Sequence, residues 1–204
     1  MDNSPRFEAL AGLSGSLLVA HPTLQDPNFE KTVILLPMHT DEGGALGVIL
    51  NRPTGQTLGE KYPDQAFQKL ASIPIFEGGP VDHSQLILTA WKWDPVENSH
   101  KMFFGITSEH VVELLESDEP VTVRAYLGYA GWSAGQLEAE LEAKSWITKP
   151  IAPDVLDQEA RTELWFKLAA DAPTSTGENL EDPSSETIDP SNSLPPPPED
   201  LDFN

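Results

Sequence analysis

Short apolar runs bounded by polar or turn-forming residues recur along the chain as far as Leu127. Runs rich in β-branched and large apolar residues predict strands, and so does strict alternation of apolar with polar residues. The predicted strands span residues 16–20, 32–36, 44–50, 85–91, 101–106 and 121–127. In the last of these, Val123 and Ala125 alternate with Arg124 and Tyr126, which favours a strand with one buried face.

Helical spacing predicts four further segments, at about 58–70, from Ser108 onward, at about 134–144 and at about 158–170. Ser108 and Asp157 are the predicted N-caps of the second and fourth. Asp94-Pro95 predicts a turn that joins two neighbouring strands. Strands outnumber helices and do not alternate regularly with them. The sequence therefore predicts an α+β fold with a mixed or antiparallel sheet rather than a doubly wound one.

A composition shift divides the chain. We expect a flexible N-terminus at residues 1–12, one domain at 13–170 and a disordered tail at 171–204. The tail holds seven prolines and nine acidic residues with no Lys or Arg, a composition that cannot bury enough apolar surface to order itself. No cysteine, secretory signal or long apolar stretch is present in the sequence, which predicts a cytoplasmic protein.

The net charge of the whole chain is −21, and setting aside the nine charges of the tail leaves −12 for residues 1–170. Proteins that bind phosphate backbones carry clusters of Lys and Arg. No such cluster occurs in this sequence. We therefore expect neither direct nucleic-acid binding nor docking on an anionic membrane surface.

One motif suggests catalysis. Residues 131–135 match G-x-S-x-G between a predicted strand and a predicted helix, as a nucleophile elbow would require. However, all five histidines precede Ser133, the reverse of the order in α/β-hydrolases. Ser133 and Gln136 also fit a capping box, which favours a structural role for the serine.

A second candidate is the segment from His39 to Gly44. His39, Asp41 and Glu42 could hold a cation or do acid–base chemistry, but Asp-Glu-Gly-Gly between two apolar runs is also typical of a hairpin turn. The turn is the favoured interpretation. The remaining histidines show no metal-ligand spacing, so we expect no metal and no cofactor.

Loop motifs supply the candidate binding residues. Arg52 follows a strong predicted strand and stands among acidic residues, where it could pair with them or anchor an anionic group. Gly78-Gly79-Pro80 is a turn signal. Residues 128–135 are glycine-rich, but Glu138 and its neighbours would repel a strongly anionic ligand, which favours a role in backbone geometry.

Together, these segments resemble the YqgE/AlgH family of bacterial proteins, over nearly all of residues 13–170. The matching blocks are Leu13–Pro22, Leu24, Asp26-Pro27, Phe29, Val33–Leu36, His39, Gly44–Pro53, Gly78–Val81, Gly128–Trp132, Gly135–Glu138, Trp146 and Trp165. The resemblance implies an α+β fold whose β portion is barrel-like and flanked by helices. It implies no agreed catalytic residues.

The leading hypothesis is a non-enzymatic binding or regulatory module that contacts a protein partner or a small ligand. Its site residues would gather in one crevice, since matching residues concentrate in loops. These candidates are His39, Asn51, Arg52, Gly78, Gly79, Pro80, Gly128, Tyr129, Gly131 and Trp132. One alternative is a transcriptional regulator, a label that some family members carry. Another is a hydrolase-type enzyme that uses Ser133 or the pair His39 and Asp41.

Overall fold

A computed structural model describes residues 13–63, 65–94, 96, 99–151, 155 and 162–170. The predicted N-terminus, the predicted tail and the predicted cap at Asp157 lie outside these residues. The strands are β1 (Ser16–Ala20), β2 (Val33–Thr40), β3 (Gly44–Ile49), β4 (Pro53–Thr57), β5 (Pro74–Glu77), β6 (Val81–Asp94), β7 (Ser99–Phe104), β8 (Thr122–Trp132) and β9 (Trp146–Pro150). The helices are α2 (Leu58–Lys61), the 3₁₀ helix η1 (Gln65–Leu70), α3 (Ser108–Leu115), α4 (Gln136–Glu142) and α6 (Thr162–Ala169).

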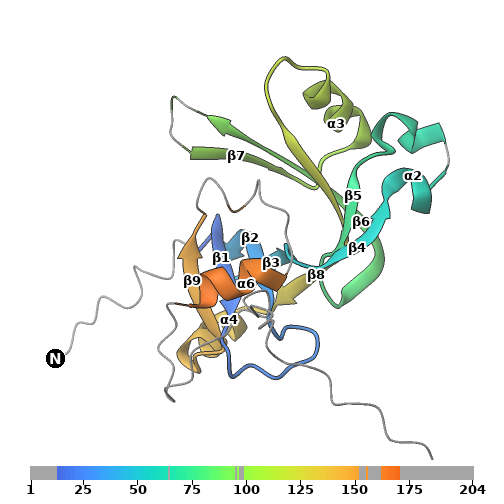
Figure 1. Cartoon of the computed structure of the whole chain (residues 1–204). Helices are drawn as coiled ribbons and strands as arrows, with labels where there is room; N and C mark the ends of the chain where they lie inside the picture. The colour runs from blue at the N-terminus through green and yellow to red at the C-terminus, as the bar shows by residue number, and fades with distance from the viewer. Residues whose placement is uncertain are drawn as a thin grey trace, which may run out of the picture.

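The nine strands are hydrogen-bonded into one network, which divides into two sheets that share β8 (Figure 1). Sheet A has the order β9-β1-β2-β3-β8 and is antiparallel throughout. Sheet B contains β4, β5, β8, β6 and β7, with β5 and β8 parallel and the other pairs antiparallel. The α+β class and the mixed sheet flanked by helices are confirmed. The described strands do not close into a barrel, because β4 and β9 end an open path.

Strand β8 changes sheet between Tyr129 and Ala130, next to Gly128. Residues up to Tyr129 pair with β5 and β6 in sheet B, and residues 130–132 pair with β3 in sheet A. Gly128 has a φ of 69°, and a Cβ atom there would lie 2.6 Å from the carbonyl oxygen of Val81. A Cβ on Gly78 would collide with the carbonyl oxygen of Gly128. The glycines therefore allow two backbones to touch where the sheets meet.

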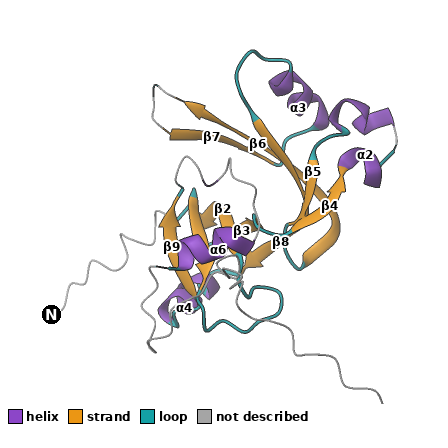
Figure 2. Ribbon diagram, viewed as in Figure 1, coloured by secondary structure: helices purple, strands orange, loops and turns teal. Residues whose placement is uncertain are grey.

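Two hydrophobic clusters lie on the two faces of sheet B. The first joins sheet A to residues such as Phe76 and Tyr126. The second lies between sheet B and the helices α2, η1 and α3, which Figure 2 shows on that side. Strand β8 is buried on both faces, with Arg124 5% and Tyr126 0% exposed. The prediction that 121–127 has one buried face is therefore wrong, because its polar face meets the first cluster.

Helix boundaries differ from the predictions for local reasons. The predicted helix 58–70 is divided into α2 and η1 around Pro63, since the residue before a proline is disfavoured in the α conformation. Tyr62 has φ −128° and ψ 78°, outside the helical region. Helix α3 is capped by Thr107, whose Oγ1 accepts a hydrogen bond from the backbone of His110, rather than by Ser108. Among the described residues, no helix is long and apolar enough to cross a membrane.

Candidate functional site

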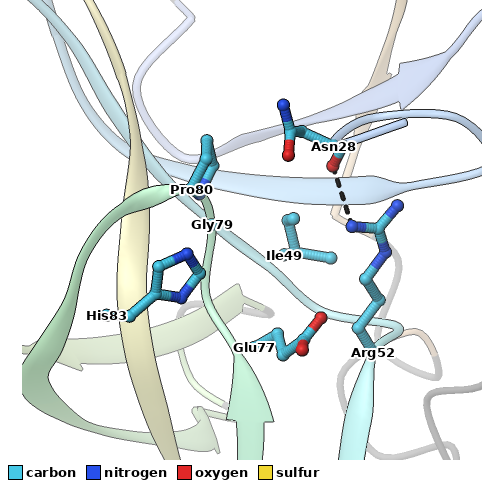
Figure 3. Close-up of a pocket in the computed structure, with 7 residues that line it drawn as sticks. All are labelled: Asn28, Ile49, Arg52, Glu77, Gly79, Pro80 and His83. Atoms are coloured by element: carbon cyan, nitrogen blue, oxygen red, sulfur yellow. Dashed lines mark hydrogen bonds between the residues drawn. The ribbon is translucent and has the colours of Figure 1, made fainter. Parts of the chain in front are cut away.

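A polar pocket of about 190 Å³ lies at the junction of the two sheets. The chain passes this junction between β3 and β4, and again between β5 and β6. Figure 3 shows the side chains that face the pocket. Its lining residues are Asn28, Ile49, Arg52, Glu77, Gly79, Pro80 and His83.

Arg52 is fixed by the loop between β1 and β2. Its Nη1 donates a hydrogen bond to the carbonyl oxygen of Asn28 at 2.9 Å, and its Nη2 lies 3.3 and 3.4 Å from the carbonyl oxygens of Pro27 and Glu30. The carbonyl of Arg52 accepts a hydrogen bond from the backbone N–H of Glu77 at 2.9 Å. The arginine thus connects the loop of sheet A with the start of β4 and the end of β5 in sheet B.

Asn51 holds the same loop from inside the protein. Its Oδ1 accepts from the backbone N–H of Val33 and its Nδ2 donates to the carbonyl of Lys31, both at 2.8 Å. The side chain is buried, with 5% exposed, and does not line the pocket. Asn51 is therefore a positioning residue for the loop that carries Asn28.

The opposite wall of the pocket contains a large irregularity in β6. Val81 pairs with Tyr129 and Leu86 pairs with Leu127, so residues 82–85 bulge out of the ladder. Asp82 has a φ of 46°, and its Oδ1 accepts a hydrogen bond from the hydroxyl of Ser84 at 2.6 Å. The bulge brings the exposed His83 to the pocket. Bulges of this kind re-aim side chains and occur often beside functional sites.

Three of the ten predicted binding residues line the pocket: Arg52, Gly79 and Pro80. Gly78 and Gly128 lie behind it, in the tight backbone contact where the sheets meet. Residues 128–132 form the end of strand β8 rather than a loop. Tyr129, Gly131 and Trp132 do not line the pocket, and neither does His39.

Sequence reasoning missed Asn28, Ile49, Glu77 and His83 as lining residues. Glu77 directly precedes the predicted turn Gly78-Gly79-Pro80, so its position next to a motif was a usable signal. His83 had no such signal, because only the bulge places it in the pocket. The sequence shows no pattern for a bulge that depends on pairing with a distant strand.

His39 belongs to a different constellation. Its side chain is 1% exposed, and its Nε2 lies 2.6 Å from Oε1 of Glu138 on α4. Burial raises the pKa of the Glu138 carboxyl, but hydrogen bonds from its own backbone and from His39, with the electrostatic attraction of His39, outweigh burial and lower that pKa. The pair joins helix α4 to strand β2.

The predicted catalytic groups do not come together. The hairpin-turn interpretation of His39 to Gly44 is confirmed, since Thr40 pairs with Gly44 and Asp41 lies exposed in the turn. Ser133 is exposed and its backbone N–H donates to Oε1 of Gln136 at 3.1 Å, one half of the predicted capping box, while Gly135 is the N-cap of α4. No hydrogen bond recorded for the described residues joins His39, Asp41 and Ser133 to one another. The part of the chain described also contains no group of three acidic or histidine side chains placed to hold a metal.

The fold and the pocket define the class of protein: an α+β domain whose two sheets share one strand and enclose a small polar pocket at their junction. The chain belongs to the AlgH-like family (DUF179), whose model matches residues 17–176. No catalytic or regulatory role is established by this membership.

Relatives and solved structures agree with the family. A UPF0301 protein of Xanthomonas campestris (strain B100) is 37% identical over 165 residues, covering 77% of this chain and 87% of the relative. A UPF0301 protein of Chlorobium chlorochromatii is 34% identical over 189 residues, covering 85% and 97%. The solution structure of the AlgH protein from Pseudomonas aeruginosa matches with a TM-score of 0.58 at 30% identity, covering 83% of this chain and 90% of that one. A crystal structure from Corynebacterium diphtheriae matches in fold, with a TM-score of 0.59 at 21% identity, covering 86% and 96%.

Proposed function

We propose that this protein is a non-catalytic cytosolic binding module whose ligand site is the junction pocket. The observation that supports the proposal is the meeting of two distant motifs. Arg52 follows β3, Gly79 and Pro80 follow β5, and all three line one hollow. Binding sites concentrate on loops that a rigid scaffold positions, and the strands on both sides of this pocket provide such a scaffold.

The size of the pocket limits its occupant. A volume of about 190 Å³ corresponds to roughly six water molecules at ~30 Å³ each. That space fits a small molecule or one side chain of a partner protein. Larger ligands would have to extend into solvent.

The chemistry of the lining suits the recognition of a polar ligand. It offers a guanidinium, a carboxylate, an imidazole and an amide, beside the apolar Ile49 and Pro80. The lining residues carry no hydroxyl, thiol or amine, so any covalent chemistry here would have to use Glu77 or His83. Groups of this kind recognise a polar ligand through charge and hydrogen bonds.

A screen of small polar molecules against the ¹⁵N-labelled full chain tests the proposal. We expect binders to shift the amide signals of Asn28, Gly79 and His83. The substitution His83→Asn should lower their affinity about fivefold, the effect of losing one partly exposed polar contact. Lys61→Met, on the exposed surface of α2, is the control and should leave binding unchanged. Binders that shift only amides remote from the junction would show the proposal to be wrong.

A further inference from the structure

Two opposite charges border the junction pocket without pairing. Arg52 directly precedes β4 and Glu77 ends β5, and the backbone N–H of Glu77 donates to the carbonyl of Arg52. Both side chains face the hollow, as Figure 3 shows. The ion pairs recorded among the described residues do not include this pair. The guanidinium instead turns to the carbonyl oxygens of the loop between β1 and β2.

Both charges retain capacity to bind a ligand. A guanidinium has five N–H donors, and the three contacts to the loop leave two of them. An ionised carboxylate accepts at about four lone-pair positions, and the exposed Glu77 uses none of them in the hydrogen bonds recorded for the described residues. His83 can add either a donor or an acceptor, depending on its tautomer. The pocket therefore offers donors and acceptors in the same small volume.

A ligand with a single charge fits this arrangement poorly. An anion that approached Arg52 would enter the repulsive field of Glu77, and it would also meet a protein with a net charge of −21. A cation that approached Glu77 would be attracted by the net negative charge of the protein but would be repelled by Arg52 at short range. A molecule that carries both charges can place each one beside its opposite. Its net charge is zero, so the net charge of the protein neither attracts nor repels it at long range.

We propose that the pocket binds a small zwitterion, with an ammonium group and a carboxylate on one short carbon chain. The carboxylate lies against Arg52, the ammonium lies against Glu77, and the carbon chain contacts Ile49 and Pro80. This inference rests on the proposed function and names the ligand class of the same site. The volume of about 190 Å³ accommodates an amino acid of a few carbons.

A homologous series of probes tests the spacing of the two charges. Glycine, β-alanine, 4-aminobutyrate and 5-aminovalerate are titrated into the ¹⁵N-labelled full chain, with propionate and propylamine as ligands of one charge. We expect one member of the series to bind best and to shift the amides of Asn28, Gly79 and His83. Each single-charge analogue should bind about fivefold more weakly or worse, the effect of losing one partly exposed ion pair.

Substitution of one charged residue tests its contribution separately from that of the other. Glu77→Gln keeps the size of an exposed side chain, and we expect it to weaken the best zwitterion about fivefold without weakening propionate. Glu42→Gln, in the exposed turn between β2 and β3, is the matched control and should change neither affinity. Amide signals outside the pocket report whether each variant remains folded.

The outcomes distinguish this inference from the proposed function. If propionate binds as tightly as the best zwitterion and Glu77→Gln has no effect, the pocket is a carboxylate site and the zwitterion inference is wrong, while the proposed function stands. Tighter binding of propylamine would likewise overturn the inference alone. If no probe in this series, and no molecule in the wider screen, shifts the pocket amides, both proposals are wrong.

Discussion

At the scale of single residues, the ionisation of the Glu138 side chain affects how helix α4 is held against β2. Its carboxylate accepts from the buried His39, and its pKa is lowered from the ordinary value of 4.5. A carboxyl with a lowered pKa in the folded state binds its proton less readily than it does in the unfolded chain. It therefore stabilises the fold above the unfolded pKa and loses this contribution as the pH falls through the folded pKa.

We accordingly predict a pH-dependent difference between the wild type and Glu138→Gln. The stability of the wild type relative to the variant should decrease as the pH falls below 4.5. Urea unfolding at a series of pH values measures this difference. Glu142→Gln, an exposed position on the same helix, should show no such dependence. A difference between wild type and Glu138→Gln that stays flat to pH 3 would contradict the prediction.

Residues at the site show where sequence reasoning worked and where it stopped. Arg52, Gly79 and Pro80 were found because they belong to compact motifs with a local signal. Trp132 was also selected from a motif, yet its ring is buried in the first cluster and its Nε1 donates to Oε2 of Glu140 at 2.9 Å. A motif marks a residue that matters to the fold, and only the tertiary packing decides whether its side chain faces core or solvent.

At the scale of elements, strand β8 shows how tertiary pairing overrides a local signal. Glycines at 128 and 131 favour a loop in the sequence, but Ala130 and Gly131 pair with β3 and extend the strand to Trp132. Strand β3 and the first half of β2 were predicted well, because their apolar runs are local features, whereas the prediction stopped at residue 36 and β2 continues to Thr40. Pairing with a strand that is distant in the sequence produces no local sequence pattern.

A glycine substitution in β8 should therefore be costly. We predict that Gly128→Ala destabilises the protein by about 3 kcal/mol or more, since it adds left-handed strain of roughly 1–2 kcal/mol to a backbone collision. Gly105→Ala is the matched control: its φ is 65°, but a Cβ there meets nothing within 4 Å. This control should cost only the strain of about 1–2 kcal/mol. Chemical denaturation of both variants measures the two effects, and equal losses would show that the close contact at the junction carries no energy.

At the scale of the whole molecule, the two hydrophobic clusters are joined through the strands of sheet B. Strand β8 contributes Tyr126 to the first cluster and Val123 and Ala125 to the second. Loss of packing in one cluster therefore also loosens a strand that packs in the other cluster. This arrangement favours one cooperative unfolding transition.

A core substitution in the second cluster tests that cooperativity. Leu58 is fully buried on α2, and Leu58→Ala should cost about 2–5 kcal/mol. Four of the five tryptophans lie in the first cluster and Trp93 is 38% exposed on β6, so the fluorescence reports mainly on the part that was not altered. We expect fluorescence and far-UV circular dichroism to shift to the same lower midpoint. Leu115→Ala, 44% exposed on α3, should leave the midpoint nearly unchanged. Separate midpoints for the two signals would show that the clusters unfold independently.

The walls of the junction pocket belong to different sheets. Asn28 lies on the loop between two strands of sheet A, whereas Glu77, Gly79, Pro80 and His83 lie on strands and turns of sheet B. A rotation of one sheet against the other would change the width of the pocket, so the inter-sheet angle and ligand affinity are thermodynamically linked. A ligand that binds more tightly at one inter-sheet angle also shifts the protein toward that angle. The free energy of this shift equals the gain in binding free energy at that angle.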